Sequence, residues 1–281
     1  MSISTGVRFS GAIELAPGFV PRQKISHVLF DFDGTLSLVR EGWPDLMLEM
    51  FLERLPPLSG DSPEELRKLL FSDMMELNGK PTIFQMERFA RRVAERGAVP
   101  LAVTEYLADF SGRLLKKIKA RTDGMENGSI PASRFLLHGA REFLELLRER
   151  GFQLWLASGT DEISVKREAA LLGVTEFFGS HIYGAQADPT AFSKKHVIDR
   201  LLRENGITGE QLVAFGDGHV EIQNTKEVGG LTVAVASDEA NNGSGRIDPW
   251  KRARLLDVGA DIVIPDFRDG EALLSLISGA A

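Results

Sequence analysis

The stretch V-L-F-D-F-D-G-T, residues 28–35, is the most informative part of this sequence. It begins as an apolar run, carries aspartates at 31 and 33, and breaks on Gly34. The run predicts a buried strand, and glycine permits the turn that ends it. At such a strand end Asp31 and Asp33 can both face one crevice, where two carboxylates can hold a hard cation or carry covalent and proton-transfer chemistry. The alternative is a strand that ends in a solvated acidic turn.

The composition is that of an ordinary globular protein. The chain has 281 residues, of which 43% are hydrophobic and 26% charged, and this length predicts one large domain or two unequal ones. A net charge of -7 without a basic stripe argues against a nucleic-acid partner. No apolar stretch approaches the roughly 20 residues of a membrane span and no signal-peptide pattern is present, so we expect a cytoplasmic protein without a membrane partner. Without cysteine, disulfides, thiolate metal sites and a cysteine nucleophile are excluded.

A long helical block interrupts an alternation of strands and helices. Apolar residues recur at helical spacing in residues 44–55, 63–78, 82–96 and 100–119, with no strand between these segments. We therefore expect residues 40–134 to form an inserted α-helical cap that packs as a small bundle. Residues 1–23, with little periodicity, are expected to be an extended lead-in that covers an edge of the core. The core itself is expected to comprise residues 24–39 and 135–281.

Strands and helices alternate again after residue 135. Strands are expected at 152–158, 180–183, 211–215, 231–236 and 261–265, and helices at 139–150, 161–172, 194–205, 220–228 and 271–277. This order indicates an α/β core of three layers, in which a mostly parallel, Rossmann-like sheet lies between helices. In such sheets, sites gather beyond the carboxyl ends of the strands.

Further polar residues follow the later strands. Ser158 ends one strand and Gly159 follows it, so that a hydroxyl and an amide can bind one anion, although an ordinary turn explains both residues. Lys194 and Lys195 open a helix whose start is already electropositive, which calls for an anionic partner. Asp217 lies at another strand end, with Glu221 four residues on. Like charges about 4 Å apart cost ~4 kcal/mol at an effective dielectric of ~20, so four converging acids predict a bound cation, for which magnesium is suited.

Together these segments resemble the haloacid dehalogenase superfamily of phosphohydrolases, with a helical C1-type cap inserted after the first motif, as in its phosphoglycolate phosphatase-like and phosphoserine phosphatase-like members. D-F-D-G-T at 31–35 matches the first motif, Ser158 the second and G-D-G-H-V-E at 216–221 the fourth. For the third we favour Lys194 over Lys195, because its distance from Asp217 resembles that in the phosphoserine phosphatase-like branch. The fourth motif more often ends in aspartate, so Glu221 departs from the pattern.

The resemblance implies a mechanism and a set of roles. Asp31 would attack phosphorus to form an aspartyl-phosphate, and Asp33 would act as general acid and then as general base. Lys194 and Ser158 would complete the catalytic set. The phosphate would be bound by Ser158 and Lys194 and by the amides of Phe32, Gly34 and Gly159. Magnesium would be held by Asp31, Asp217 and the Asp33 carbonyl, with Glu221 binding it directly or through water.

The expected function is magnesium-dependent hydrolysis of a small phosphorylated metabolite, such as a sugar or polyol phosphate. The resemblance also implies that dehalogenating members lack a carboxylate two residues after the nucleophile, because halide leaves without a proton. Asp33 therefore argues against dehalogenation. A sugar phosphomutase and a non-catalytic phosphate-binding regulatory module stay as alternatives. Arg40, Lys80 and His219 are candidate substrate contacts, although Arg40 can equally form a salt bridge and Lys80 can lie in a solvated loop. The sequence leaves the oligomeric state open.

Overall fold

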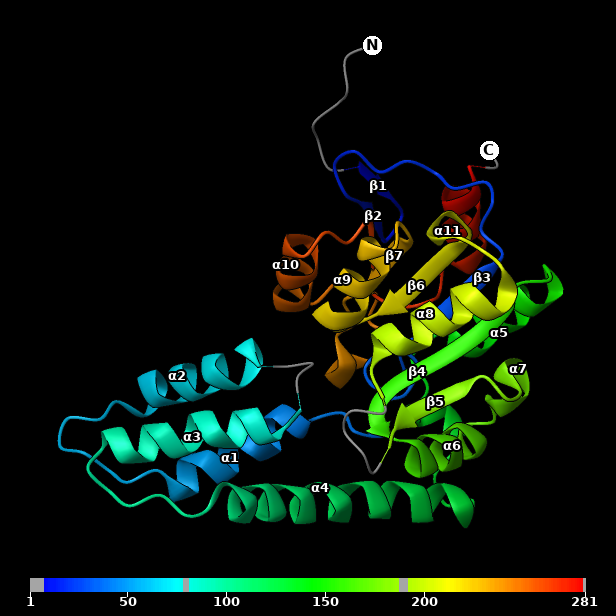
Figure 1. Cartoon of the computed structure of the whole chain (residues 1–281). Helices are drawn as coiled ribbons and strands as arrows, with labels where there is room; N and C mark the ends of the chain where they lie inside the picture. The colour runs from blue at the N-terminus through cyan, green and yellow to red at the C-terminus, as the bar shows by residue number, and fades with distance from the viewer. Residues whose placement is uncertain (1–7, 78–80, 187–191, 280–281) are drawn as a thin grey trace. The chain divides into compact units, whose positions relative to one another are not determined.

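The computed structural model describes residues 8–77, 81–186 and 192–279 (Figure 1). The chain divides into two compact units. Met1–Glu41 and Gly124–Ala281 form the first, and Gly42–Asp123 form the second. The first is an α/β unit, and the described part of the second is helical.

Eight strands form a single sheet in the described part of the α/β unit. Those from β8 to β5 pair in parallel, whereas the β1–β2 and β2–β8 pairs are antiparallel. In sheet order the strands are β1 (Arg8–Ser10), β2 (Ile13–Leu15), β8 (Ile262–Ile264), β7 (Leu231–Val235), β6 (Leu212–Gly216), β3 (His27–Phe30), β4 (Gln153–Asp161) and β5 (Ile182–Ala185). The mostly parallel sheet predicted from the sequence is therefore confirmed.

Strand β3, which precedes Asp31, lies between β4 and β6. Its side chains alternate between the two faces of the sheet, as strand geometry requires. Leu29 joins an apolar cluster with Trp155 and Ile198, whereas Phe30 packs against Phe143 and Phe215. A strand buried on both faces reads as a continuous apolar run, which is what the sequence has before Asp31.

Helices cover both faces of this sheet (Figure 1). Helix α8 packs through the Leu29 cluster and α9 and α10 through a neighbouring one, whereas α5 and α11 contact each other. The helices of this unit are α5 (Ala140–Glu149), α6 (Glu162–Leu171), α7 (Thr175–Phe178), α8 (Lys194–Asn205), α9 (His219–Glu227), α10 (Pro249–Asp257) and α11 (Gly270–Ser278). The layered α/β architecture expected from the sequence is present.

The second unit has its own core. Phe51 and Phe89 stack at 4.1 Å between ring centroids, and Tyr106 meets Phe89 edge to face. Buried Asp73 pairs with Arg92 at the rim of this core. The helices that contribute are α1 (Trp43–Arg54), α2 (Pro63–Glu76), α3 (Ile83–Glu95) and α4 (Val103–Glu126). Each helix therefore buries an apolar stripe within the unit, as the helical periodicity predicted.

Several predicted boundaries are wrong. Helix α4 begins at Val103 and continues to Glu126, beyond the expected end at 119, and residues 124–134 belong to the α/β unit and not to the helical block. The lead-in contains the β1–β2 hairpin, whose second strand extends the sheet by pairing with β8. Helix α10 was not predicted, although Asp248 caps it and Pro249 follows, a common helix start. Among the described helices, none is both long and apolar enough to span a membrane.

Candidate active site

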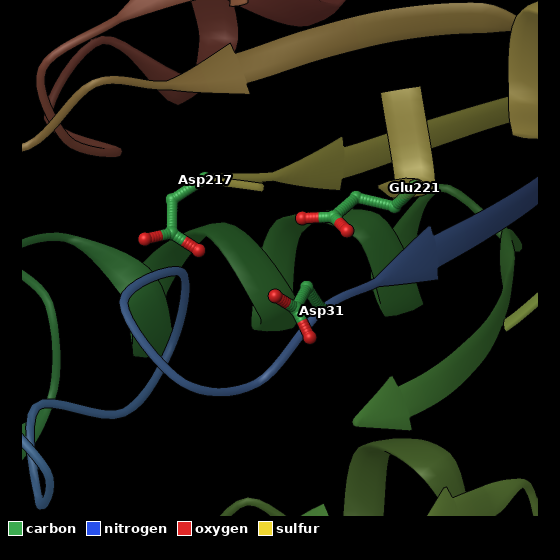
Figure 2. A group of neighbouring side chains, drawn as sticks. All are labelled: Asp31, Asp217 and Glu221. Atoms are coloured by element: carbon green, nitrogen blue, oxygen red, sulfur yellow. The ribbon is translucent and has the colours of Figure 1, made fainter. Parts of the chain in front are cut away.

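Three carboxylates predicted to bind metal meet at the carboxyl edge of the sheet (Figure 2). Asp31 follows β3, Asp217 follows β6, and Glu221 lies in the first turn of α9. One oxygen from each lies within 4.8 Å of the other two. Six-coordinate magnesium, with ligands at about 2.1 Å, spans about 4.2 Å between opposite ligands, so a small inward movement would let these oxygens share one ion. The donor set therefore fits a hard divalent cation.

Glycines make this approach possible. Gly34 has a φ of 76°, in the left-handed region that side chains disfavour, and an added Cβ would lie 2.2 Å from Asp217 Oδ2. A Cβ at Gly216 would lie 2.3 Å from Glu221 Cγ. The Gly218 amide donates to Glu221 Oε1 at 2.6 Å and fixes that carboxylate at the start of α9. The glycines of the first and fourth motifs thus hold two backbone turns close to the acids.

Lys194 lies in this acidic cluster and Lys195 does not. The Lys194 ammonium is 2.8 Å from both Asp31 Oδ1 and Glu221 Oε2, whereas Lys195 pairs with exposed Glu227 at 3.2 Å. Burial opposes the charge on Lys194, but the two carboxylates outweigh it and raise the pKa of that lysine. Of the two lysines that begin α8, Lys194 is therefore the one in contact with the acidic cluster.

The acids of the cluster have unequal environments. Burial raises the pKa of Asp31 well above its usual value, and the Lys194 ammonium opposes that rise. Burial also raises the pKa of Asp217, to about 6, although Lys251 donates to its Oδ2 at 3.1 Å. For Glu221 burial is again the largest effect, but the hydrogen-bonded Lys194 outweighs it and lowers the pKa of that carboxyl. Glu221 is therefore held as a carboxylate beside the lysine.

Asp33 points to a second group of donors. Its Oδ2 accepts from Thr160 Oγ1 at 2.7 Å and from Ser158 Oγ at 3.2 Å, and its Oδ1 accepts from Arg40 Nη1 at 3.1 Å. The Thr160 amide in turn donates to Ser158 Oγ at 3.0 Å. The end of β4 and the turn after β3 thus meet through this one carboxylate.

The predicted phosphate-binding amides have different surroundings. The Gly34 amide donates to the Ser37 carbonyl at 2.9 Å, so its hydrogen is used within the turn. The Phe32 carbonyl accepts three amides of the same turn and its side chain is buried. Gly159 is exposed at the end of β4, next to buried Ser158.

Two of the three predicted substrate contacts lie among the described residues, and each has a charged or ring partner in the protein. Arg40 pairs with buried Glu168 and with Asp33, which is the salt-bridge alternative for that residue. His219 Nδ1 lies 2.6 Å from Arg254 Nη2, between α9 and α10. Lys80 lies outside the described residues.

Sequence reasoning missed three residues of the site. Lys251 donates to Asp217, Ser237 and Glu239, although nothing in the sequence of α10 indicated that its first turn reaches the acids. Glu168, in the second half of α6, had no signal either. Thr160 did have one, because it follows Ser158-Gly159 at the end of a predicted strand.

A family sequence model covers the part of the chain that contains the acidic cluster of this site. The sequence model of the haloacid dehalogenase-like hydrolases matches residues 25–229, which include every residue of the acidic cluster. The chain belongs to this hydrolase family. The comparison with curated protein sequences found no match to this hydrolase.

Solved structures share the fold of this hydrolase at low identity. A predicted phosphoglycolate phosphatase from Haemophilus somnus has a TM-score of 0.58 and 18% identity, over 89% of this chain and 98% of its own. A family hydrolase from Deinococcus radiodurans, with bound phosphate and sodium, has a TM-score of 0.58 and 18% identity, over 92% and 97%. A putative β-phosphoglucomutase from Thermotoga maritima has a TM-score of 0.53 and 16% identity, over 92% and 100%. At these identities the likeness shows the fold.

Proposed function

We propose that this hydrolase is a magnesium-dependent phosphatase that acts on a small phosphorylated metabolite through an aspartyl-phosphate. One observation carries the proposal. The buried Asp31 carboxylate lies 2.8 Å from the Lys194 ammonium inside a cluster of acids, and a second carboxylate, Asp33, follows two residues later. This is the arrangement that in-line phosphoryl transfer requires, because the reaction needs a placed nucleophile and neutralised oxygens.

Asp31 is the proposed nucleophile. One of its oxygens attacks phosphorus, the bond from phosphorus to the leaving oxygen breaks, and water later releases phosphate from Asp31. Burial raises the pKa of Asp31, so the ionised form needs a cation beside it. Lys194 supplies one, and its remaining hydrogen can bind a phosphoryl oxygen.

Asp33 is the proposed acid and base. It gives its proton to the leaving oxygen in the first step and takes one from the attacking water in the second. Its position supports this role, because Thr160 and Ser158 hold one of its oxygens at the end of β4. The phosphate itself is proposed to rest against Ser158, Lys194 and the amides of Phe32 and Gly159.

Magnesium is the proposed cofactor. Asp31 and Asp217 would hold it with the Asp33 carbonyl, and when bound it would neutralise charge on the phosphoryl oxygens. Both oxygens of Glu221 already accept hydrogen bonds, from the Gly218 amide and from Lys194, which favours contact through water over direct ligation. Sodium and phosphate are bound in the Deinococcus structure, so a relative of this fold accepts both kinds of ion.

The test is phosphate release from a panel of sugar and polyol phosphates with and without Mg²⁺. We expect wild-type turnover that depends on Mg²⁺ and is abolished by Asp31→Asn. Asp199→Asn, the same change on the exposed face of α8, is the matched control and should retain activity. The absence of turnover across a broad phosphoester panel would contradict the proposal.

A sugar phosphomutase would use the same residues and differ by keeping the phosphoryl group on the sugar. Addition of a sugar bisphosphate to the assay separates the two reactions. A mutase would interconvert sugar monophosphates faster than it releases phosphate, whereas a phosphatase would release phosphate at the same rate with or without the bisphosphate. A non-catalytic module would bind phosphate without either reaction.

A further inference from the structure

Arg40 bridges two carboxylates from different parts of the α/β unit. Its Nη2 donates to Glu168 Oε1 at 2.8 Å, and its Nη1 contacts both Glu168 Oε2 and Asp33 Oδ1, the latter at 3.1 Å. The Arg40 side chain is 14% exposed and that of Glu168 is 4% exposed. Arg40 is therefore held by a two-pronged contact with a buried carboxylate while one nitrogen faces Asp33.

The opposite side of Asp33 is fixed as well. Thr160 and Ser158 donate to Oδ2, at 2.7 Å and 3.2 Å, and Arg40 donates to Oδ1. Donors on both oxygens determine the rotation of a carboxyl group about its last bond as well as its position. Proton transfer requires such placement, because the donor must lie within about 2.6–3.2 Å of the atom it protonates.

Glu168 gives Arg40 a fixed position and offsets its charge. Burial raises the pKa of Glu168, and Arg40 opposes that rise, so each of the two groups stabilises the charge on the other. A buried guanidinium without this partner would be expensive to keep and free to change its direction. Paired with Glu168, it presents a hydrogen bond to Asp33 from a locally neutral ion pair.

We propose that Arg40 and Glu168 are a positioning pair for the acid and base Asp33. The proposal rests on the proposed phosphatase function. As the bond from phosphorus to the leaving oxygen breaks, its electron pair stays on that oxygen, which takes the proton from Asp33. Arg40 touches Asp33 and Glu168 touches Arg40, so the pair acts on the reaction through Asp33.

This role makes a prediction that depends on the leaving group. An alkoxide is a strong base and needs the proton of Asp33, whereas p-nitrophenolate leaves without one. Loss of positioning should slow alkyl phosphates selectively. A change that only disturbs the fold or the binding of phosphate should slow both kinds of substrate alike.

The experiment compares kcat/KM for p-nitrophenyl phosphate and for an alkyl phosphate that the wild type hydrolyses, both with Mg²⁺. General acid catalysis contributes about 10²- to 10⁴-fold, so for Arg40→Lys and Glu168→Gln we expect a loss of about 10- to 100-fold on the alkyl phosphate. The loss on p-nitrophenyl phosphate should be below about 3-fold. Lysine keeps the charge of Arg40 but lacks the planar fork that contacts two carboxylates.

Arg268→Lys is the matched control. Arg268 also makes a two-pronged contact with a buried carboxylate in the same unit, that of Asp266, at 2.8 Å and 2.7 Å. We expect this variant to leave the ratio of the two kcat/KM values unchanged. Circular dichroism and thermal unfolding confirm that each variant is folded before its kinetics are compared.

Three results would overturn the inference. Equal losses on both substrates would make the pair structural, and a raised KM at unchanged kcat in Arg40→Lys would make Arg40 a substrate ligand. Wild-type kinetics in folded Arg40→Lys and Glu168→Gln would show that Asp33 needs no such support. If the wild type hydrolyses no phosphoester in the panel, the proposed function falls and the inference falls with it.

Discussion

Replacing Gly34 by alanine tests whether the turn after β3 is built to admit Asp217. The Gly34 backbone has a φ of 76°, and an added Cβ would lie 2.2 Å from Asp217 Oδ2 and 2.6 Å from its Cγ. Ordinary van der Waals contact begins at 3.4 Å. The carboxylate would therefore have to withdraw by about 1.2 Å, the difference between the two distances, whereas metal–ligand distances vary by only about 0.2 Å.

Two separate losses follow from this geometry. The left-handed backbone conformation costs a non-glycine residue about 1–2 kcal/mol of folding stability. The displacement of Asp217 removes one of the three clustered carboxylates from the proposed magnesium site. We expect Gly34→Ala to weaken Mg²⁺ binding by at least about tenfold, the lower end of what loss of an oriented contact at a metal site produces.

The assay is calorimetric titration with Mg²⁺ together with thermal unfolding of the metal-free protein. Gly151→Ala is the control, because Gly151 has a φ of 79° and an added Cβ there meets no described atom within 4 Å. Both variants should lose similar stability from the backbone, but only Gly34→Ala should lose Mg²⁺ affinity. Unchanged Mg²⁺ affinity in folded Gly34→Ala would refute the reasoning, since Asp217 would then not be needed where the structure places it.

Three further predictions follow from the other buried groups. Glu221→Asp shortens the side chain by one methylene and breaks its contacts with Lys194 and the Gly218 amide. Because a hydrogen bond to a charged group contributes about 1.5–3 kcal/mol, kcat/KM should fall by about tenfold or more. Wild-type kinetics in this variant would contradict the prediction. Burial raises the pKa of Asp217 to about 6, so Mg²⁺ must displace a proton from this carboxyl below that pH. The affinity for Mg²⁺ should therefore fall about tenfold for each pH unit below 6. Calorimetry that detects no proton release on Mg²⁺ binding at pH 5 would argue against this prediction. Burial lowers the pKa of His27, so the folded state binds its proton less tightly than the unfolded state, and stability present above about pH 6.5 is lost as the pH falls. Urea unfolding at pH 7.5 and 5.5 should show a smaller decrease in the free energy of unfolding for His27→Gln than for the wild type. An equal decrease would exclude His27 as its source.

Much of the fold could be predicted because its signals are local. The apolar run before Asp31 and the alternation after residue 135 reflect the burial of strands and helix faces, and helix α8 has the bounds that its periodicity predicted. The lead-in was harder to interpret, because a strand of three residues such as β2 has too few side chains to show a period. Boundaries of the helical block failed for another reason. Helix α4 runs through the limit between the two units, so no change of periodicity marks it.

The sequence by itself determined which residues carry the proposed chemistry. Asp31, Asp33 and Asp217 each follow a strand and Ser158 lies near the end of one. The carboxyl ends of parallel strands lie at one edge of a sheet, so their order along the chain was enough to predict that they meet. Only the tertiary structure decided how these groups are held. Arg40 and Glu168 are 128 residues apart, and Lys251 is 34 residues from Asp217. Such pairs depend on how whole helices pack against the sheet, and an isolated arginine, glutamate or lysine has the same local sequence pattern whether it faces solvent or a buried partner.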